Sequence, residues 1–318
     1  MVPDQKETGD KFLVKFQGER YDIHEFIRFH PGGRKTLYGY QGKSLDAPLK
    51  VHSHSRAAYH LLGQFAINRK QDYNDYESFV DWNKPLLRQV SSLGNRYWEW
   101  VNLPVNRPIR LFYSDLLELL TVTPWYLIPI FWIPTICYFF YLGCTLDIPD
   151  SIANHTVGVL VSYAVGVLIW TFLEYVLHRK IFHYKPPSNS KVLITLHFLL
   201  HGVHHKAPFD NQRLVFPPLA GIIVVLVLRS IWTTFLPLTM MNFIFTGGIS
   251  GYMCYDLMHY YLHYGTPRPG TYFYNMKRNH NYHHFSHHEL GFGISSTLWD
   301  YILETSINLP ALDKPIEW

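Results

Sequence analysis

The sequence predicts a small globular domain followed by an all-α integral membrane domain of about four transmembrane helices, with a helical metal-binding cap on the cytosolic side. Three observations predict this architecture. The first third of the chain is polar and the remainder is strongly apolar, although the mean hydropathy of the whole is near zero. The apolar part contains four segments that approach the roughly 20 residues needed to cross a bilayer. It also carries most of the 19 histidines, in closely spaced groups.

The composition excludes several classes of protein. Aromatic residues make up 17% of the chain and charged residues only 16%, and the net charge of +4 is too small and too dispersed to indicate a nucleic-acid partner. Cys137, Cys144 and Cys254 lie in apolar stretches without a CxxC pair, so no oxidising compartment is implied. The first twenty residues are charged and lack an apolar core, which predicts no cleavable signal peptide and insertion through internal spans.

The domain boundaries follow from changes in composition. Residues 1–68 are predicted to form the globular domain, with short apolar runs and the turn-forming sequence His30-Pro31-Gly32-Gly33. Residues 69–110 are polar and contain three prolines, so we expect a linker on the membrane surface. Residues 111–318 are predicted to be the membrane domain.

Four apolar segments predict the membrane spans, and they run over Leu119–Leu142, Ile152–Leu177, Pro218–Pro237 and Thr239–Met258. Three prolines in the first predict a kinked or broken helix, and the last two could instead form one re-entrant hairpin. Each crossing changes the side of the membrane, so both chain ends and the histidine-rich stretches should share one face. Arginine and lysine are plentiful there, which predicts that this face is cytosolic.

The histidines after the second span form the groups His178-x4-His183, His201-x2-His204-His205, His259-x3-His263 and His280-x2-His283-His284. Residues three or four apart share one face of a helix, so these imidazoles can point inward together. Imidazole binds several first-row metals, so residue type does not choose among them. A single histidine on an apolar face is more often a core residue. Ten clustered ones exceed the four ligands of a structural zinc site and could hold two ions, with about five ligands each.

This arrangement resembles the fatty acid hydroxylase superfamily of integral membrane diiron enzymes. The strings EYVLHRKIFH, HFLLHGVHHKAPFDNQRLVFPP and ELGFGISSTLWD resemble in particular the fatty acid 2-hydroxylases that act on sphingolipid acyl chains. The resemblance covers nearly the whole chain. It implies two iron ions, which zinc could replace in an isolated sample. It also implies ten ligands, namely His178, His183, His201, His204, His205, His259, His263, His280, His283 and His284.

Other histidines near these motifs have no place in that ligand pattern. His197 lies one helical turn before His201, where it could support the ligand imidazoles or line the substrate path. His287 and His288 are interpreted as surface residues.

Four carboxylates near the motifs could orient ligand imidazoles through their distal N–H groups, namely Glu174, Asp256, Glu289 and Asp300. Asp256 is the preferred partner, because it lies three residues before His259 on the same helical face. A capping or interface role is the alternative. Five tyrosines at the cytosolic rim could shape a substrate channel or be plain interface residues, namely Tyr255, Tyr260, Tyr261, Tyr272 and Tyr282.

The N-terminal domain resembles cytochrome b5 through the sequence HPGG at His30 and the following HSRAA that begins at His54. The resemblance implies a small α+β fold that binds haem b between these two histidines. Two axial histidines leave no open iron position, so the domain would carry electrons and not bind oxygen. His52 is the alternative second ligand, and a haem-free docking module is the alternative role.

Together these features predict an O2-dependent monooxygenase that converts RH, O2, two electrons and two protons into ROH and water. The resemblance implies that it acts at C-2 of a fatty acyl or ceramide chain. The expected partners are the lipid bilayer and a pyridine-nucleotide-dependent cytochrome reductase, and the expected location is the endoplasmic reticulum membrane. The alternatives are a sterol desaturase or methyl oxidase, a sphingoid-base hydroxylase, or a haem-containing membrane zinc-binding or transport protein.

Overall fold

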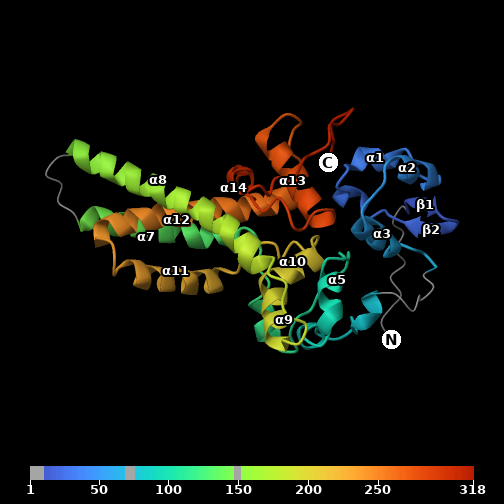
Figure 1. Ribbon diagram of the computed structural model, residues 1–318, viewed down its shortest axis with the longest axis horizontal. Coiled ribbons are helices and arrows are strands. Elements are labelled where there is room, and N and C mark those ends of the chain that lie inside the picture. Colours follow the sequence, from blue (N-terminus) through green and yellow to red (C-terminus); the bar gives the residue numbers. More distant parts are fainter. Residues whose placement is uncertain (1–10, 69–75, 147–151) are drawn as a thin grey trace.

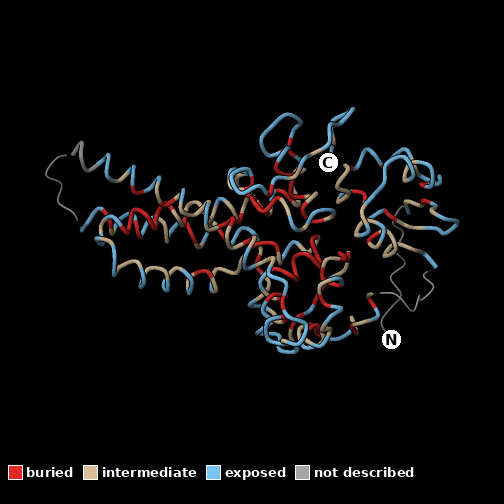
Figure 2. The backbone as a smooth tube through the Cα atoms, in the orientation of Figure 1, coloured by how far each residue is buried: buried red, intermediate tan, exposed pale blue. Residues whose placement is uncertain are grey.

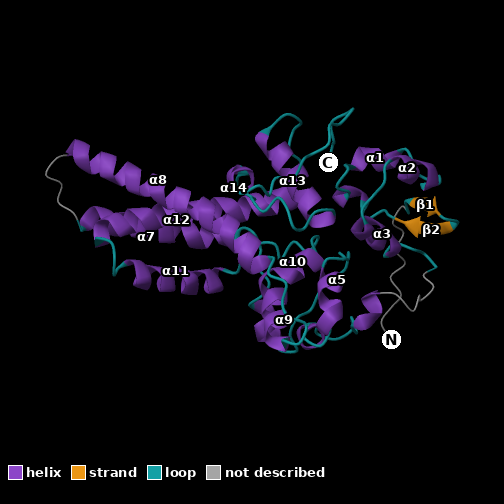
Figure 3. Ribbon diagram, viewed as in Figure 1, coloured by secondary structure: helices purple, strands orange, loops and turns teal. Residues whose placement is uncertain are grey.

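The computed structural model describes residues 11–68, 76–146 and 152–318, which form a small α+β domain followed by a helical domain (Figure 1). Residues 1–10 of the predicted first domain and 69–75 of the predicted linker lie outside the described residues. Within the described residues, strands occur only in the first domain (Figure 3). The elements of that domain are β1 (Leu13–Phe16), β2 (Glu19–Asp22), η1 (Ile27–Phe29), α1 (Arg34–Tyr38), α2 (Asp46–Val51) and α3 (Arg56–Gly63).

The elements that follow are almost all helices. They are η2 (Tyr76–Phe79), α4 (Leu87–Val90), η3 (Gly94–Arg96), α5 (Tyr97–Val101), α6 (Asp115–Leu119), α7 (Leu127–Thr145), α8 (Ile152–Val176), η4 (Leu177–Phe182), α9 (Lys191–His197), η5 (Phe198–Gly202), α10 (Val203–Lys206), α11 (Pro218–Trp232), α12 (Leu238–Tyr264), α13 (Tyr272–Phe285) and α14 (Leu298–Ile302).

The first domain is built on an antiparallel hairpin of β1 and β2. Gln17 and Gly18 form its two-residue turn, both with positive φ, which is the conformation that matches the twist of the flanking strands. Helices close over the hairpin and bury a core that includes Val14, Ile23 and Leu45. This core gives the domain its own hydrophobic centre.

The described part of the predicted linker is folded. Val90, Tyr97 and Trp100 are fully buried and pack in one core with Ile194 and Phe198 of the helical domain. The expectation of a surface linker is therefore wrong for residues 76–110. The low average hydropathy of the segment concealed its buried aliphatic and aromatic side chains, among them Tyr97 and Trp100.

Four longer helices, α7, α8, α11 and α12, lie side by side (Figure 1). Leu127–Thr145 and the 27-residue helix Thr156–Phe182 are long and apolar enough to cross a membrane. Helix α11 has 15 residues, a length of about 22 Å at 1.5 Å per residue, and so is short for a hydrocarbon core of about 30 Å. Helix α12 is 27 residues long and packs on both α7 and α8. Crossing by the last two segments stays a prediction.

The first span begins later than predicted. Helix α6 ends at Leu119, and α7 begins only at Leu127, beyond Pro124. Pro129 lies in the first turn of α7, where its missing N–H leaves no hydrogen bond unmade, whereas Pro134 lies inside the helix. The run of apolar residues therefore begins before the helix itself begins.

Helices α8 and α12 cross with their backbones nearly touching. A Cβ atom on Gly166 would lie 2.0 Å from the carbonyl oxygen of Ile244, and one on Gly247 would lie 2.0 Å from that of Tyr163. Small residues allow this approach between apolar helices. Figure 2 shows buried residues along α12, which places this helix at the centre of the bundle.

We expect Gly247→Val to separate α8 from α12. The free energy of unfolding of the detergent-solubilised protein should fall by about 1–3 kcal/mol or more, the usual cost of overpacking a core site. Thermal unfolding followed by circular dichroism measures this. Gly248→Ala is the control, because its Cβ would meet its nearest neighbour at 3.6 Å, an ordinary contact. Equal melting temperatures for both variants would contradict the close crossing.

Candidate metal centre

The first pair of histidines is brought together by a π-helical turn. Helix α8 continues into η4, and the backbone N–H of His183 donates to the carbonyl oxygen of His178 at 3.0 Å. Residues five apart diverge by about 140° on an α-helix of 3.6 residues per turn, but a π-turn aligns them. A second π-turn, η5, carries His201. The unusual x4 spacing was the signal in the sequence for this geometry.

The ten predicted ligands form two groups, and within each group the ligand atoms lie within 4.8 Å of one another. The first group is His178, His183, His201, His205 and His283, and the second group is His204, His259, His263, His280 and His284. Nearly all of these side chains are buried. The described structure therefore offers two adjacent sites with five imidazoles each.

The two groups share their helices in a way the sequence did not reveal. His201 and His205, one helical turn apart, belong to the first group, and His204 between them belongs to the second. Consecutive residues on a helix point about 100° apart, so the neighbours in each HxxHH motif must face different ions. On helix α13 the outer two histidines of the motif, His280 and His284, belong to the second group, and His283 belongs to the first. Each HxxHH motif thus joins both sites.

The donor atoms of the first group fit a bound cation. The Nδ1–H of His178 donates to the carbonyl oxygen of Phe292 at 2.5 Å, and that of His283 donates to the carbonyl oxygen of Leu290 at 2.7 Å. Each Nε2 atom therefore keeps a free lone pair. Both face the Nε2 atom of His183, at 3.2 and 3.0 Å. Nitrogens about 2.1 Å from one ion and at right angles to each other would be about 3 Å apart, so an ion explains this convergence.

The second group shows the same convergence. The Nε2 atom of His204 lies 2.9 Å from that of His284 and 3.0 Å from that of His259. Burial, followed by the neighbouring imidazoles, holds the pKa of His204 and His284 well below the usual value. These side chains are therefore neutral at physiological pH, the state in which imidazole binds a metal.

Two carboxylates act on the ligands through a loop. Glu174 accepts hydrogen bonds from the backbone N–H groups of Ile294 and Ser295, at 2.8 and 2.7 Å. Asp300 accepts from two more, at 2.9 and 2.8 Å, of which the first belongs to Phe292. Because carbonyl oxygens of this same loop receive the ligand Nδ1–H groups, the carboxylates fix the imidazoles indirectly. Direct contact was the expectation, and only the folded loop shows the intervening backbone.

Asp256 also acts on a backbone segment. Its carboxylate accepts from the backbone N–H of Phe216, at 3.1 Å, and from the hydroxyl of Tyr252, at 3.2 Å. His259, the ligand that it was expected to orient, hydrogen-bonds the backbone of Leu214 in the same segment. Support of the ligand by Asp256 through this segment is therefore a proposal and does not involve direct contact.

The remaining candidates lie outside both groups. His197 is buried and forms a hydrogen bond with the hydroxyl of Tyr97, which belongs to the misassigned linker. The side chain of His287 is exposed, whereas that of His288 is half-buried. Glu289 is 81% exposed, so it has little influence on the buried imidazoles.

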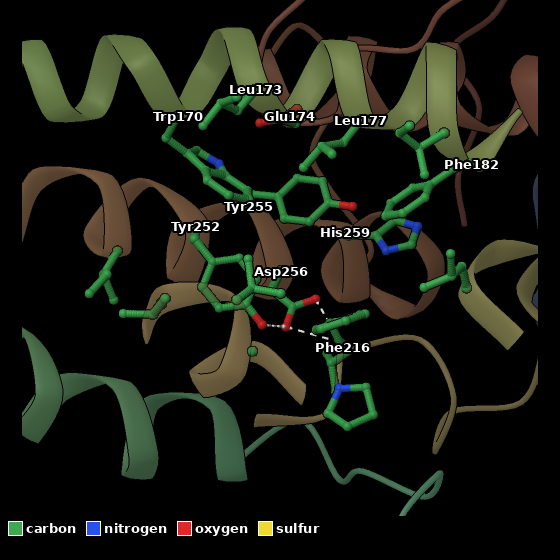
Figure 4. Close-up of a pocket in the computed structure, with 18 of the residues that line it drawn as sticks. Trp170, Leu173, Glu174, Leu177, Phe182, Phe216, Tyr252, Tyr255, Asp256 and His259 are labelled. Atoms are coloured by element: carbon green, nitrogen blue, oxygen red, sulfur yellow. Dashed lines mark hydrogen bonds between the residues drawn. The ribbon is translucent and has the colours of Figure 1, made fainter. Parts of the chain in front are cut away.

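A cavity of about 500 Å³ lies between α8, α11 and α12 and reaches His201, His204 and His259 (Figure 4). Its lining is mainly apolar. Of the five tyrosines proposed from the sequence, Tyr255 lines it, and Tyr252 was missed although it lies one helical turn earlier. The lining does not include Tyr260, Tyr261, Tyr272 or Tyr282.

The predicted haem ligands face each other in the first domain. The rings of His30 and His54 are 6.4 Å apart between centroids and only 18° from parallel. The Nδ1–H of His30 donates to Gly33 at 3.0 Å and that of His54 donates to His52 at 2.7 Å, so each Nε2 keeps its lone pair. This spacing fits one iron between two nitrogens at about 2 Å each. His52 contributes a backbone carbonyl to the arrangement.

We expect His201→Ala and His204→Ala each to weaken one site, so the metal content of the purified protein should fall by about one ion per chain in either variant. Inductively coupled plasma mass spectrometry measures this. His287→Ala is the matched control, because its side chain is exposed and outside both groups. Unchanged metal content in both variants would refute the two-site assignment.

Asp300→Ala should release the loop that holds His178 and His283. The metal affinity of the first group should then fall roughly 10–100-fold, as is typical when a contact that supports a ligand is lost. Chelator titration measures this. Both of those ligands belong to the first group, so the second group should keep its affinity, and equal losses at both would contradict the role of the loop.

Comparison with known proteins places the chain. Residues 163–305 match the fatty acid hydroxylase family, and residues 4–81 match the cytochrome b5-like heme/steroid binding domain. Fatty acid 2-hydroxylase of Mus musculus is 42% identical, over 90% of this chain and 89% of the relative, and that of Homo sapiens is 40% identical, over 90% and 88%. The ceramide very long chain fatty acid hydroxylase of Saccharomyces cerevisiae is 30% identical, over 94% and 91%.

A solved structure shows the same fold. It is described as full length scs7p with only the hydroxylase domain visible, is 33% identical, and has a TM-score of 0.66 over 77% of this chain and 92% of that one. The two buried histidine groups lie within residues 163–305, the part that matches the fatty acid hydroxylase family. With its N-terminal cytochrome b5-like domain and its helical histidine-rich core, the chain belongs to the fatty acid hydroxylase family and is an enzyme of the fatty acid 2-hydroxylase type.

Proposed function

We propose that the protein inserts one oxygen atom from O2 at C-2 of a long-chain fatty acid or a sphingolipid N-acyl chain, at a centre of two iron ions held by the two histidine groups. The single observation that carries this proposal is the apolar cavity that ends at His201, His204 and His259. The names of the similar hydroxylases, which include ceramide hydroxylases, support the substrate class. Iron held there would supply the activation of O2.

The cavity suits an acyl chain. It lies among the apolar helices, and its volume of about 500 Å³ is within the range of pockets that bind small molecules. Trp132 and Trp170 pack against Tyr252 at centroid distances of 5.2 Å each and give the wall a rigid aromatic surface. Burial of the tail there removes apolar surface from water and holds the chain in one direction.

Polar groups in the cavity gather near the ligands. The Tyr255 ring lies nearly parallel to that of His259, 6.1 Å away, and its hydroxyl is directed along the cavity (Figure 4). Tyr252 and Asp256, one helical turn apart on α12, form a hydrogen-bonded pair. A carboxyl or amide end held by such groups would place the adjacent C-2 close to the reacting centre, because the position of the head fixes that of its neighbouring carbon.

The haem domain would supply electrons one at a time. His30 and His54 would hold haem b between them, and a haem held by two histidines would have no open coordination position and would carry electrons. A pyridine-nucleotide-dependent cytochrome reductase would reduce it. We further propose that the protein is a multi-pass protein of the endoplasmic reticulum membrane whose two histidine groups and chain ends face the cytosol, where such a reductase would reach the haem.

Purified protein loaded with iron and haem should convert a long-chain fatty acid or ceramide to its 2-hydroxy form in the presence of O2, reductase and pyridine nucleotide. Mass spectrometry with 18O2 should show one labelled oxygen in the product. His54→Ala should abolish reductase-supported turnover and alter the haem absorbance. Product formation in the His204→Ala variant at the wild-type rate would overturn the proposal.

A further inference from the structure

Residues 316–318 lie between the loop of the first predicted haem ligand and helix α13, which carries three candidate metal ligands (Figure 1). The indole of Trp318 is 8% exposed, and its N–H donates to the carbonyl oxygen of Pro31 at 2.9 Å. On the opposite side, its ring packs on Tyr274 of α13 at a centroid distance of 5.1 Å. The Lys277 ammonium lies 5.1 Å from the ring centre. One side chain thus contacts both domains.

The backbone of this segment makes equally close contacts. The N–H of Ile316 donates to the hydroxyl of Tyr274 at 2.8 Å. Gly33 has a φ of +84°, and a Cβ atom there would lie 2.6 Å from the carbonyl oxygen of Glu317. The last glycine of the HPGG motif is therefore required for the approach of this segment as well as for the turn. Lys35 and Glu317 form an exposed ion pair at the edge.

From α13 the contacts continue to the second histidine group. The Lys277 ammonium donates to the carbonyl oxygen of His263 at 3.1 Å. Independently, Phe29 packs on Phe209 at 5.1 Å, and Phe209 stacks on Phe285 at 6.0 Å, next to the last candidate ligand of α13. Both routes from the haem domain end at members of the second group.

We propose that residues 316–318 are an interdomain clamp, with Trp318 at its centre, which docks the haem domain on α13 so that electrons leave the haem toward the second group. The inference rests on the proposed function. Each transfer converts ferrous haem to ferric haem and reduces the metal centre by one electron. Two transfers supply one turnover, and the reductase re-reduces the haem each time. Trp318 is a positioning residue, because it contacts neither the substrate nor the reacting atoms.

The docked arrangement itself can be tested without any catalytic activity. A carbodiimide, which joins neighbouring lysine and glutamate side chains without a spacer, should link Lys35 to Glu317 in the full-length holoprotein, and peptide mass spectrometry detects the product. Trp318→Ala should reduce the yield about tenfold or more, because buried interface tryptophans are among the residues that dominate docking. Leu312→Ala, at an exposed residue of the same stretch, is the control and should leave the yield unchanged.

The electron-transfer role requires a second measurement. Pre-reduced haem in the anaerobic holoprotein should be reoxidised by the oxidised metal centre about tenfold or more slowly in Trp318→Ala, as expected for an undocked population. Trp318→Phe keeps the aromatic ring and loses the indole N–H, so its rate should lie between those of the wild type and Trp318→Ala. Haem absorbance and metal content should match the wild type in both variants.

A comparison of reductants separates this inference from the proposed function. Turnover driven by a small-molecule reductant that bypasses the haem should be unaffected in Trp318→Ala, whereas turnover through the reductase should fall. If the wild-type enzyme were inactive with both reductants, the proposed function would be refuted. The cross-link and reoxidation measurements would then still test the clamp. Wild-type cross-link yield in Trp318→Ala, or loss of its haem absorbance, would overturn the clamp.

Discussion

The structure depends on the convergence of ten imidazoles at the end of an apolar helical bundle. Buried lone pairs that face one another about 3 Å apart repel unless a proton or a metal cation lies between them, and one cation in each group would satisfy five imidazoles at once. The fold pre-assembles it from four directions. The η4 turn at the end of α8 and the helix α12 supply ligands from the bundle. The HxxHH motifs, which belong to both groups, lie on η5 with α10 and on α13. A shift of either HxxHH segment would disturb both sites at once, whereas η4 contributes only to the first group and α12 only to the second.

Support for the ligands comes from backbone segments held by buried carboxylates. Glu174 and Asp300 fix the loop that accepts the Nδ1–H groups of His178 and His283. A backbone carbonyl is neutral, so it orients the imidazole without adding negative charge beside the metal. The carboxylates themselves are satisfied by several N–H donors, which is how buried charged groups are normally accommodated. The same loop therefore links the bundle, the second HxxHH motif and the first site.

The two domains contact each other through residues that the sequence analysis assigned neither to the haem site nor to the metal centre. Trp318 and Phe209 lie in irregular segments, and each packs against both domains. Arg107 of the misassigned linker also contacts Gln64 of the haem domain. In the proposed function the first domain donates electrons to the metal pair, and these contacts would hold donor and acceptor near each other.

The sequence by itself determined the two-part organisation, the residue types and the spacing of the candidate ligands, because spacing and residue chemistry are local properties. His30, His54 and the four histidine motifs could be read without a structure. Tertiary structure alone decided which imidazoles converge in the same group, since His204 and His205 are neighbours in the chain but belong to different groups. It also decided that residues 76–110 contribute buried side chains to the core, that carboxylates contact a loop that holds the imidazoles, and that Tyr252 lines the cavity. These depend on contacts between residues far apart in the chain, which no local pattern records.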